Sequence, residues 1–127
     1  MGAALAAATT LGIGGPMEML ARPRNSEELA RLLAAAGDEG LRVRVLGAGS
    51  NILAADEGVK GLVVRLSGRN FSFVEQLPAA LRCGAGLKLS RLVREAAAAG
   101  LSGLEGLAGI PGTVGGALVM NAGGRYG

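Results

Sequence analysis

Residues 43–53 read VRVLGAGSNIL, an alternating strand that runs directly into a glycine turn. The alternation of apolar and polar residues is typical of a half-buried strand. Gly47 and Gly49 then let the backbone turn sharply and approach another group, and Ser50 and Asn51 follow with a hydroxyl and an amide. A loop of this kind can present several N–H groups to one point and so hold a phosphate. A plain tight turn is the alternative interpretation of the same residues.

Two familiar phosphate-binding loops do not fit this stretch. The P-loop requires a Gly-Lys-Ser/Thr triplet, which does not occur in the chain. The Rossmann fingerprint requires a third glycine where this chain has Ile52, and a helix directly afterwards. Asp56, Glu57 and Gly58 would interrupt any such helix. If the loop binds a phosphate, it does so in a different fold.

The residues before the loop predict a helix within residues 22–40. Asn25 can cap it, Glu28 completes a capping box, and Gly37 and Gly40 are expected to end it. Its expected apolar stripe consists of Leu29, Leu32, Leu33 and Ala36.

The residues after the loop predict further strands and a second helix. Residues 58–67, GVKGLVVRLS, are dense enough in Leu and Val for a strand that is buried on both faces. Residues 71–77 and 80–86 predict a hairpin around Pro78, and residues 88–100 predict an amphipathic helix that stops at a glycine. Helix and strands together indicate an α/β unit followed by a second small unit.

Composition limits the chemistry that the chain can perform by itself. The 127 residues suit one modest domain. A net charge of +3 without a basic stripe, and only 2% aromatic residues, argue against nucleic-acid binding and suit an anionic ligand. With no histidine and a single cysteine, Cys83, there is no Ser-His or Cys-His pair, no usual zinc site and no disulfide. Cys83 is expected to be a small core residue on a strand.

The first residues predict no export or membrane attachment. The apolar stretch at the start of the chain is short and lacks a basic n-region, so neither a signal peptide nor a membrane span is expected. A cytoplasmic protein is the default.

Glycine accounts for 23 residues, far above ordinary usage, and gathers in two more segments. TTLGIGGP, residues 9–16, predicts either a buried turn before the first strand or a ligand contact. AGIPGTVGGALVMNAGG, residues 108–124, removes side chains over a stretch that could lie along an elongated ligand, with Ile110 and Val114 flanking a flat ring. Close helix-to-backbone packing without a ligand is the alternative for the second segment.

Taken in order, TTLGIGGP, VLGAGSNIL and GLSGLEGLAGIPGTVGGALVMNAGGRYG resemble the UDP-N-acetylenolpyruvoylglucosamine reductase family, over nearly the whole chain from Thr9. The resemblance implies an α/β (α+β) FAD-binding fold of the p-cresol methylhydroxylase and vanillyl-alcohol oxidase type. Residues 1–127 would be FAD-binding domain, with a first subdomain to about residue 68 and the start of a second from about residue 69. The family's substrate domain would lie outside these residues.

The same resemblance implies a site for non-covalent FAD, since no histidine is present to tether the flavin. The glycine turn would bind the pyrophosphate through backbone N–H groups, and the later segment would run beside the flavin, continued by the NAGGRYG tail. No catalytic residue and no metal ligand is assigned. The implied cofactor-binding residues are Leu46, Gly47, Ala48, Gly49, Ser50, Asn51, Ile52, Gly109, Ile110, Pro111, Gly112, Thr113, Gly115, Gly116, Ala117 and Asn121.

The family's reaction is the NADPH-dependent reduction of UDP-N-acetylglucosamine enolpyruvate to UDP-N-acetylmuramate through FAD, a step of peptidoglycan synthesis. This implies an enolpyruvyl nucleotide as substrate, no nucleic-acid or membrane partner, and a monomer. The residues of acid catalysis are expected downstream of this chain. Two alternatives stay open: an FAD-linked hydroxy-acid oxidase or dehydrogenase of the same fold, and a non-catalytic truncated FAD-binding fragment.

Overall fold

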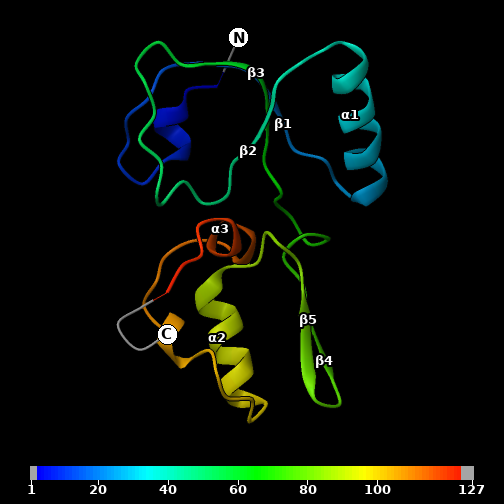
Figure 1. Ribbon diagram of the computed structural model, residues 1–127, viewed down its shortest axis with the longest axis vertical. Coiled ribbons are helices and arrows are strands. Elements are labelled where there is room, and N and C mark those ends of the chain that lie inside the picture. Colours follow the sequence, from blue (N-terminus) through cyan, green and yellow to red (C-terminus); the bar gives the residue numbers. More distant parts are fainter. Residues whose placement is uncertain (1–2, 124–127) are drawn as a thin grey trace. The chain divides into compact units, whose positions relative to one another are not determined.

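The computed structural model describes residues 3–123, and the chain forms two compact units, residues 1–67 and 68–127 (Figure 1). Their assignment as subdomains of one FAD-binding domain stays a prediction. Within residues 3–123, no helix combines the length and the apolar composition needed to cross a membrane. In chain order, the first unit contains η1 (Leu5–Ala8), β1 (Met17–Ala21), α1 (Ser26–Asp38), β2 (Val43–Val45) and β3 (Val59–Val64).

The first unit is built on a parallel sheet with the strand order β1-β3-β2. The central strand β3 is buried on both faces, as its sequence predicts: Leu62, Val63 and Val64 are only 5%, 2% and 0% exposed. A continuous apolar run is the usual signature of a central parallel strand, because both of its faces are covered.

Each face of the sheet carries its own hydrophobic core, one beneath the helix and loops on one side and one beneath the helix on the other (Figure 1 shows the helices). On one face lies η1 with the loops, and on the other lies α1. Burying a large apolar side chain contributes about 1.5–3 kcal/mol, so each core adds to the stability of the unit. The first core cluster is Leu5, Ala8, Met17, Leu46 and Val63. The second core cluster is Ala36, Leu62 and Val64, with Leu29, Leu32 and other half-buried residues packed against it.

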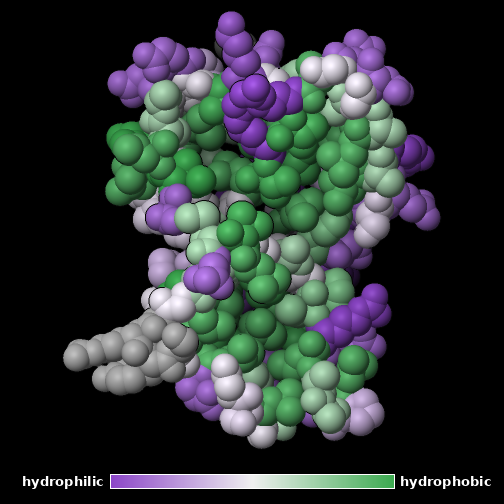
Figure 2. All heavy atoms as spheres, viewed as in Figure 1, coloured by the Kyte–Doolittle hydropathy of each residue, from purple (hydrophilic) through white to green (hydrophobic). Residues whose placement is uncertain are grey.

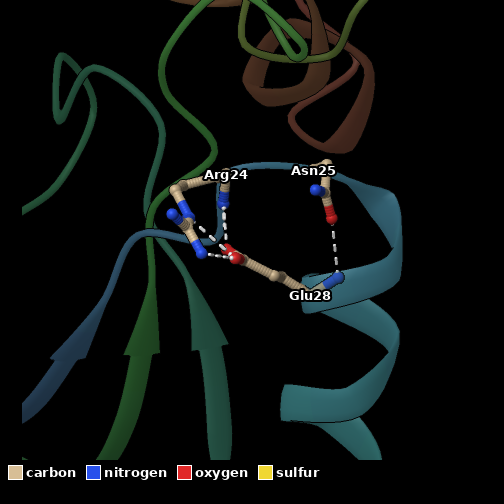
Figure 3. A network of polar contacts seen from close by, with 3 residues as sticks. All are labelled: Arg24, Asn25 and Glu28. Atoms are coloured by element: carbon tan, nitrogen blue, oxygen red, sulfur yellow. Dashed lines mark hydrogen bonds and ion pairs between the residues drawn. The ribbon is translucent and has the colours of Figure 1, made fainter.

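The predicted cap of α1 is present, with one difference (Figure 3). The Asn25 Oδ1 accepts a hydrogen bond from the Glu28 N–H at 2.8 Å. The Glu28 carboxylate, however, accepts from the N–H of Arg24 at 2.7 Å rather than from that of Asn25. A hydrogen bond from the Arg24 guanidinium to the same carboxylate holds the pKa of Glu28 below its usual range. The reciprocal half of the capping box is therefore displaced by one residue.

Two expectations for the end of α1 and for its apolar stripe are wrong. Gly37 lies inside the helix, which ends at Asp38, and the stop is made by Gly40 at a left-handed φ of +64°. The Gly40 N–H donates to the Gly37 carbonyl at 3.0 Å, as in a Schellman cap. Leu33 is 43% exposed, because at 3.6 residues per turn it lies off the face that meets the sheet.

The second unit contains the predicted hairpin and helix. Its strands pair antiparallel around Pro78, and Cys83 lies half-buried on the second of them, where burial raises the pKa of its thiol. The predicted stop of the helix is at Gly100, with a φ of +69°. Its elements are β4 (Val74–Leu77), β5 (Ala80–Cys83), α2 (Leu89–Ala98), η2 (Glu105–Leu107) and α3 (Val114–Val119). Its buried apolar residues are Phe71, Leu87, Leu89 and Ala96.

Candidate functional site

The loop after β2 crosses one face of the sheet, because β2 and β3 are parallel neighbours. Residues 46–58 make this crossing without a helix, and a parallel connection takes about a dozen residues or more. Ala54 packs against the first core cluster, and the Gly15 N–H donates to the Ala55 carbonyl at 2.9 Å. The start of the crossing, residues 47–52, is called the glycine loop below. It lies at the carboxyl edge of the sheet, where open α/β sheets bind ligands.

Four of the six backbone N–H groups of the glycine loop have no acceptor recorded among the described residues. The ladder beside β2 ends with the Leu46 N–H, which donates to the Val64 carbonyl at 2.9 Å. Backbone N–H groups of folded proteins usually find an acceptor, so a cluster without one marks a place where a ligand can supply it. A concave group of such donors suits an anion. Within residues 3–123 no acceptor is recorded for the N–H groups of Gly47, Ala48, Gly49 and Asn51, while Ser50 and Asn51 form a turn that Ile52 closes.

Gly49 has a structural reason to be glycine that does not depend on a ligand. It is buried, with a left-handed φ of +69°. A Cβ there would run into the Ala8 carbonyl oxygen and would lie 2.8 Å from the Thr9 Cα. The Thr10 N–H donates to the Gly49 carbonyl at 3.0 Å. The backbone at the end of η1 and in the turn after it therefore packs against Gly49 and hydrogen-bonds to it, which fixes the position of the glycine loop.

Exposed apolar side chains lie beside this loop. Figure 2 shows apolar residues gathered over the loops on the η1 side of the first unit. Gly14 allows the segment of residues 9–16 to pack closely against η1 and the crossing after β2. A Cβ on Gly14 would lie 2.9 Å from the Leu5 Cβ and in contact with Ala54. None of residues 9–16 is buried, so the expectation of a buried turn in this segment is wrong. The exposed apolar residues are Leu11, Ile13, Ile52 and Leu53.

The second glycine segment, in the second unit, differs in chemistry. At the start of α3, the N–H of Val114 donates to Leu87 at 2.9 Å, and that of Gly115 donates to Ala85 at 2.8 Å. The Gly116 N–H donates to the hydroxyl of Thr113 at 3.2 Å, which makes Thr113 the N-cap. The first donors of α3 are therefore satisfied by the protein and are not offered to an anion.

The glycines of this segment also have local roles. Gly109 and Gly112 have left-handed φ values of +82° and +128°. A Cβ on Gly115 would lie 3.0 Å from the Cβ of Ala85, so the helix packs closely on that backbone. At Gly109 a Cβ would meet open space, which leaves this position accessible.

Asn121 lies at the C-terminal cap of α3. Its φ is +47°, its N–H donates to the Leu118 carbonyl at 3.1 Å, and the Ala122 N–H donates to the Ala117 carbonyl at 2.8 Å. These two bonds define a Schellman motif, in which a left-handed residue, usually Gly or Asn, closes the helix. The sequence analysis proposes that the Asn121 amide contacts the ligand. The left-handed backbone gives a second, structural reason for an asparagine at this position.

A carboxylate holds the turn before the second glycine segment. Glu105 accepts a hydrogen bond from the Gly103 N–H at 2.7 Å. Hydrogen bonds from its own N–H and from that of Gly103 lower the pKa of Glu105, so it is ionised near neutral pH. An ionised carboxylate repels an anion, so Glu105 is not expected to bind a phosphate. Its role is to accept hydrogen bonds from backbone N–H groups.

The sequence-predicted residues fall into one group in each unit. Leu46 belongs to the core and not to an exposed surface, being 5% exposed. Residues 47–52 share one loop, and residues 109–117 with Asn121 flank or form α3. Residues 124–127 of the expected tail lie outside the described residues. Sequence reasoning did not single out Arg22 and Arg65, which directly follow β1 and β3 at the edge where the glycine loop begins.

Comparison with known proteins places this chain among flavin-binding sequences. A family described as "FAD binding domain" matches residues 17–127. UDP-N-acetylenolpyruvoylglucosamine reductase 2 of Symbiobacterium thermophilum is 47% identical over 119 residues, which are 94% of this chain and 38% of that protein. The corresponding reductase of Synechococcus sp. (strain CC9311) is 48% identical over 123 residues, covering 97% of this chain and 39% of that protein.

A solved structure agrees with these matches. The crystal structure of a UDP-N-acetylenolpyruvylglucosamine reductase (MurB) from Thermus caldophilus matches with a TM-score of 0.82 and 50% sequence identity. It covers 100% of this chain and 44% of that chain. The chain thus spans about two fifths of the length of the relatives it matches. The resemblance and the FAD-binding fold expected from the sequence are confirmed.

Gly49→Ala should destabilise the protein more than Gly12→Ala. The two glycines have nearly equal φ values of +69° and +66°, but only at Gly49 would a Cβ meet backbone atoms, while Gly12 faces open space. Left-handed backbone costs an alanine about 1–2 kcal/mol at either site, so any further loss at Gly49 measures the clash. Urea unfolding followed by circular dichroism gives both free energies of unfolding. Equal losses would contradict the packing role of Gly49.

Proposed function

The chain belongs to the family of FAD-binding domains, and we propose on that basis that its glycine loop binds the pyrophosphate of a non-covalently held FAD. The observation that carries the proposal is that, within the described residues 3–123, no acceptor is recorded for the neighbouring N–H groups of Gly47, Ala48, Gly49 and Asn51. The pyrophosphate carries negative charge and several acceptor oxygens, which these donors can satisfy together. When bound, FAD supplies hydride-transfer chemistry, while the chain's own residues bind and orient it.

The surroundings of the loop support an amphipathic ligand. Leu11, Ile13 and Leu53 are 62%, 44% and 81% exposed beside the donors. Several exposed apolar side chains in one small unit indicate a surface that binds a ligand or a partner. A dinucleotide combines a charged centre with flat ring systems, so it matches both kinds of surface.

The second glycine segment is proposed to contribute to the flavin end of the same cofactor. Its contribution would come from shape, because the first donors of α3 already have protein acceptors. The open position at Gly109 and the half-buried Ile110 and Val114 offer such a surface. We therefore keep as a proposal the cofactor-binding role that the sequence assigns to this segment. Its residues are Gly109, Ile110, Pro111, Gly112, Thr113, Gly115, Gly116, Ala117 and Asn121.

For the complete protein we propose the activity named for its relatives. It would use NADPH to reduce UDP-N-acetylglucosamine enolpyruvate to UDP-N-acetylmuramate in peptidoglycan precursor synthesis, as a cytoplasmic monomer. This chain would supply the FAD-binding part, with its two units as subdomains. The sequence identity of 47–48% to two reductases supports the assignment.

The glycine-loop proposal predicts that Ala48→Asp weakens FAD binding. Ala48 is exposed, so the new carboxylate adds charge beside the donors without filling the core. A like charge about 4 Å away costs about 1 kcal/mol in water and more near a protein surface, so affinity should fall roughly tenfold. Quenching of flavin fluorescence on binding measures the dissociation constant.

Ala48→Asn is the matched control, since it has the same shape without the charge. It should bind FAD nearly as well as the unmodified chain. Gly49→Asp is a poorer choice, because any Cβ at Gly49 meets the Ala8 carbonyl and disturbs the fold. Equal affinities of the Asp and Asn variants would refute a phosphate site at the glycine loop.

Asn121→Gly separates the two roles available to Asn121. Glycine adopts the left-handed φ of the cap readily but lacks the amide, so stability should be kept. If the amide contacts FAD, affinity falls by about three- to tenfold, the value of one neutral hydrogen bond. Asn121→Ala is the companion variant and should lose about 1–2 kcal/mol of stability. Unchanged FAD affinity in the glycine variant would remove Asn121 from the cofactor site.

The complete protein should consume NADPH only when UDP-N-acetylglucosamine enolpyruvate is present. Loss of NADPH absorbance with chromatographic detection of UDP-N-acetylmuramate measures this. Oxidation of glycolate or lactate, with the enolpyruvyl nucleotide left untouched, would instead support a hydroxy-acid oxidase of the same fold. A complete protein that binds no FAD would contradict both.

A further inference from the structure

Two arginines stand in one row with the start of the glycine loop. The strand register aligns Ala21 of β1 with Val64 of β3, and Val64 with Val45 of β2. The ladder continues beyond these residues, because the Arg65 N–H donates to the Ala21 carbonyl at 2.9 Å. The next row across the sheet, in the strand order β1-β3-β2, is Arg22, Arg65 and Leu46.

Side-chain alternation places Arg65 on the face of the first core cluster. Val63 belongs to that cluster, and Val64 belongs to the second. Leu66 also packs against the second cluster, so the alternation continues past the end of β3. Because successive residues of a strand face opposite sides, Arg65 shares the face of Val63.

The same reasoning places Arg22 on that face. Leu20 packs against the first core cluster and Ala21 against the second, so Arg22 follows Leu20. Leu46, the third member of the row, belongs to the first cluster and leads directly into the glycine loop. Neighbouring strands are about 4.8 Å apart, so Arg65 lies one strand spacing from Leu46 and Arg22 lies about two.

Neither charge is neutralised within the described part of the chain. Across residues 3–123, no carboxylate is recorded at ion-pair distance from Arg22 or Arg65. Arg24, two residues beyond Arg22, pairs with Glu28 instead. Arg65 is half-buried, and a guanidinium that is partly removed from water favours an anionic partner.

We propose that Arg65, with Arg22 beside it, binds the diphosphate of the dinucleotide from the strand side while the glycine loop binds it through backbone N–H groups. The inference rests on the proposed function of that loop. The N–H groups bring only partial charges, whereas a guanidinium brings a full charge and two parallel donors that match phosphate oxygens. The two arginines make the site selective for a ligand with a charged linker over the uncharged flavin alone.

Arg65→Gln and Arg22→Gln test the inference in the full chain, with FAD, ADP and riboflavin as probes. Arg65→Gln should weaken FAD and ADP binding by about tenfold or more, the usual effect of losing one charge-assisted hydrogen bond. Arg22, which is exposed and farther from the loop, should have a smaller effect. Added salt should weaken FAD binding less in the variants than in the unmodified chain. Riboflavin, which lacks phosphate, should bind equally to all.

Arg42→Gln is the matched control, because it removes the same charge from the amino-terminal side of β2, at the opposite edge of the sheet. Arg65→Lys keeps a charge and should bind FAD better than Arg65→Gln does, which separates charge from packing. Thermal unfolding of each variant checks the fold.

The outcomes distinguish this inference from the function on which it rests. If the unmodified chain binds neither FAD nor ADP, the proposed function fails, and the inference fails with it. If the unmodified chain binds FAD and Arg65→Gln matches Arg42→Gln, only the inference is overturned. Equal loss of riboflavin and FAD affinity in Arg65→Gln would also overturn it, since that result indicates a structural role.

Discussion

The burial of β3 on both faces is the constraint on which the first unit depends. Leu62 and Val64 contact the core beneath α1, and Val63 contacts the core beneath η1. Because β1, β3 and β2 are parallel, the chain has to return across the sheet after β1 and again after β2. The first return is made by α1 on one face, and the second by residues 46–58 on the other. The same crossings that cover β3 bring the strand ends, the glycine loop and two arginines to one edge.

The two glycine-rich segments look alike in sequence but differ in what they offer. In the glycine loop, Gly49 lets the backbone lie against Ala8, and in the part of the chain that the structure describes no acceptor is recorded for the N–H groups of Gly47, Ala48, Gly49 and Asn51. In the second segment, Gly115 likewise packs against Ala85, but the donors at the start of α3 are already satisfied by Leu87, Ala85 and Thr113. Glycine content alone therefore does not identify a phosphate site. What distinguishes the two segments is whether the surrounding backbone accepts their hydrogen bonds.

Local signals in the sequence were sufficient for most elements. The Asn25 cap, the apolar run of β3 and the hairpin around Pro78 each follow from short-range rules and are present. Errors arose where a residue's neighbours are set by packing. Leu33 fits the apolar stripe by spacing but is exposed, because the sheet covers only the face that contains Leu29 and Leu32. Gly37 is a plausible stop by composition, yet the helix continues to Asp38 and closes at Gly40.

The sequence by itself determined the two longer helices and the strands between them, the FAD-binding family and the segment that carries the glycine loop, because motif spacing and hydrophobic periodicity are properties of the chain alone. The short helices η1, η2 and α3 were not expected from it. Only the tertiary structure decided which donors of that segment are unpaired and which glycines serve packing. It also decided that Arg22 and Arg65 stand in line with the loop, since these residues are 43 positions apart in the chain and 24 and 19 positions from Leu46. Strand pairing brings them into one row, and no local pattern encodes a register between strands that are joined through crossings.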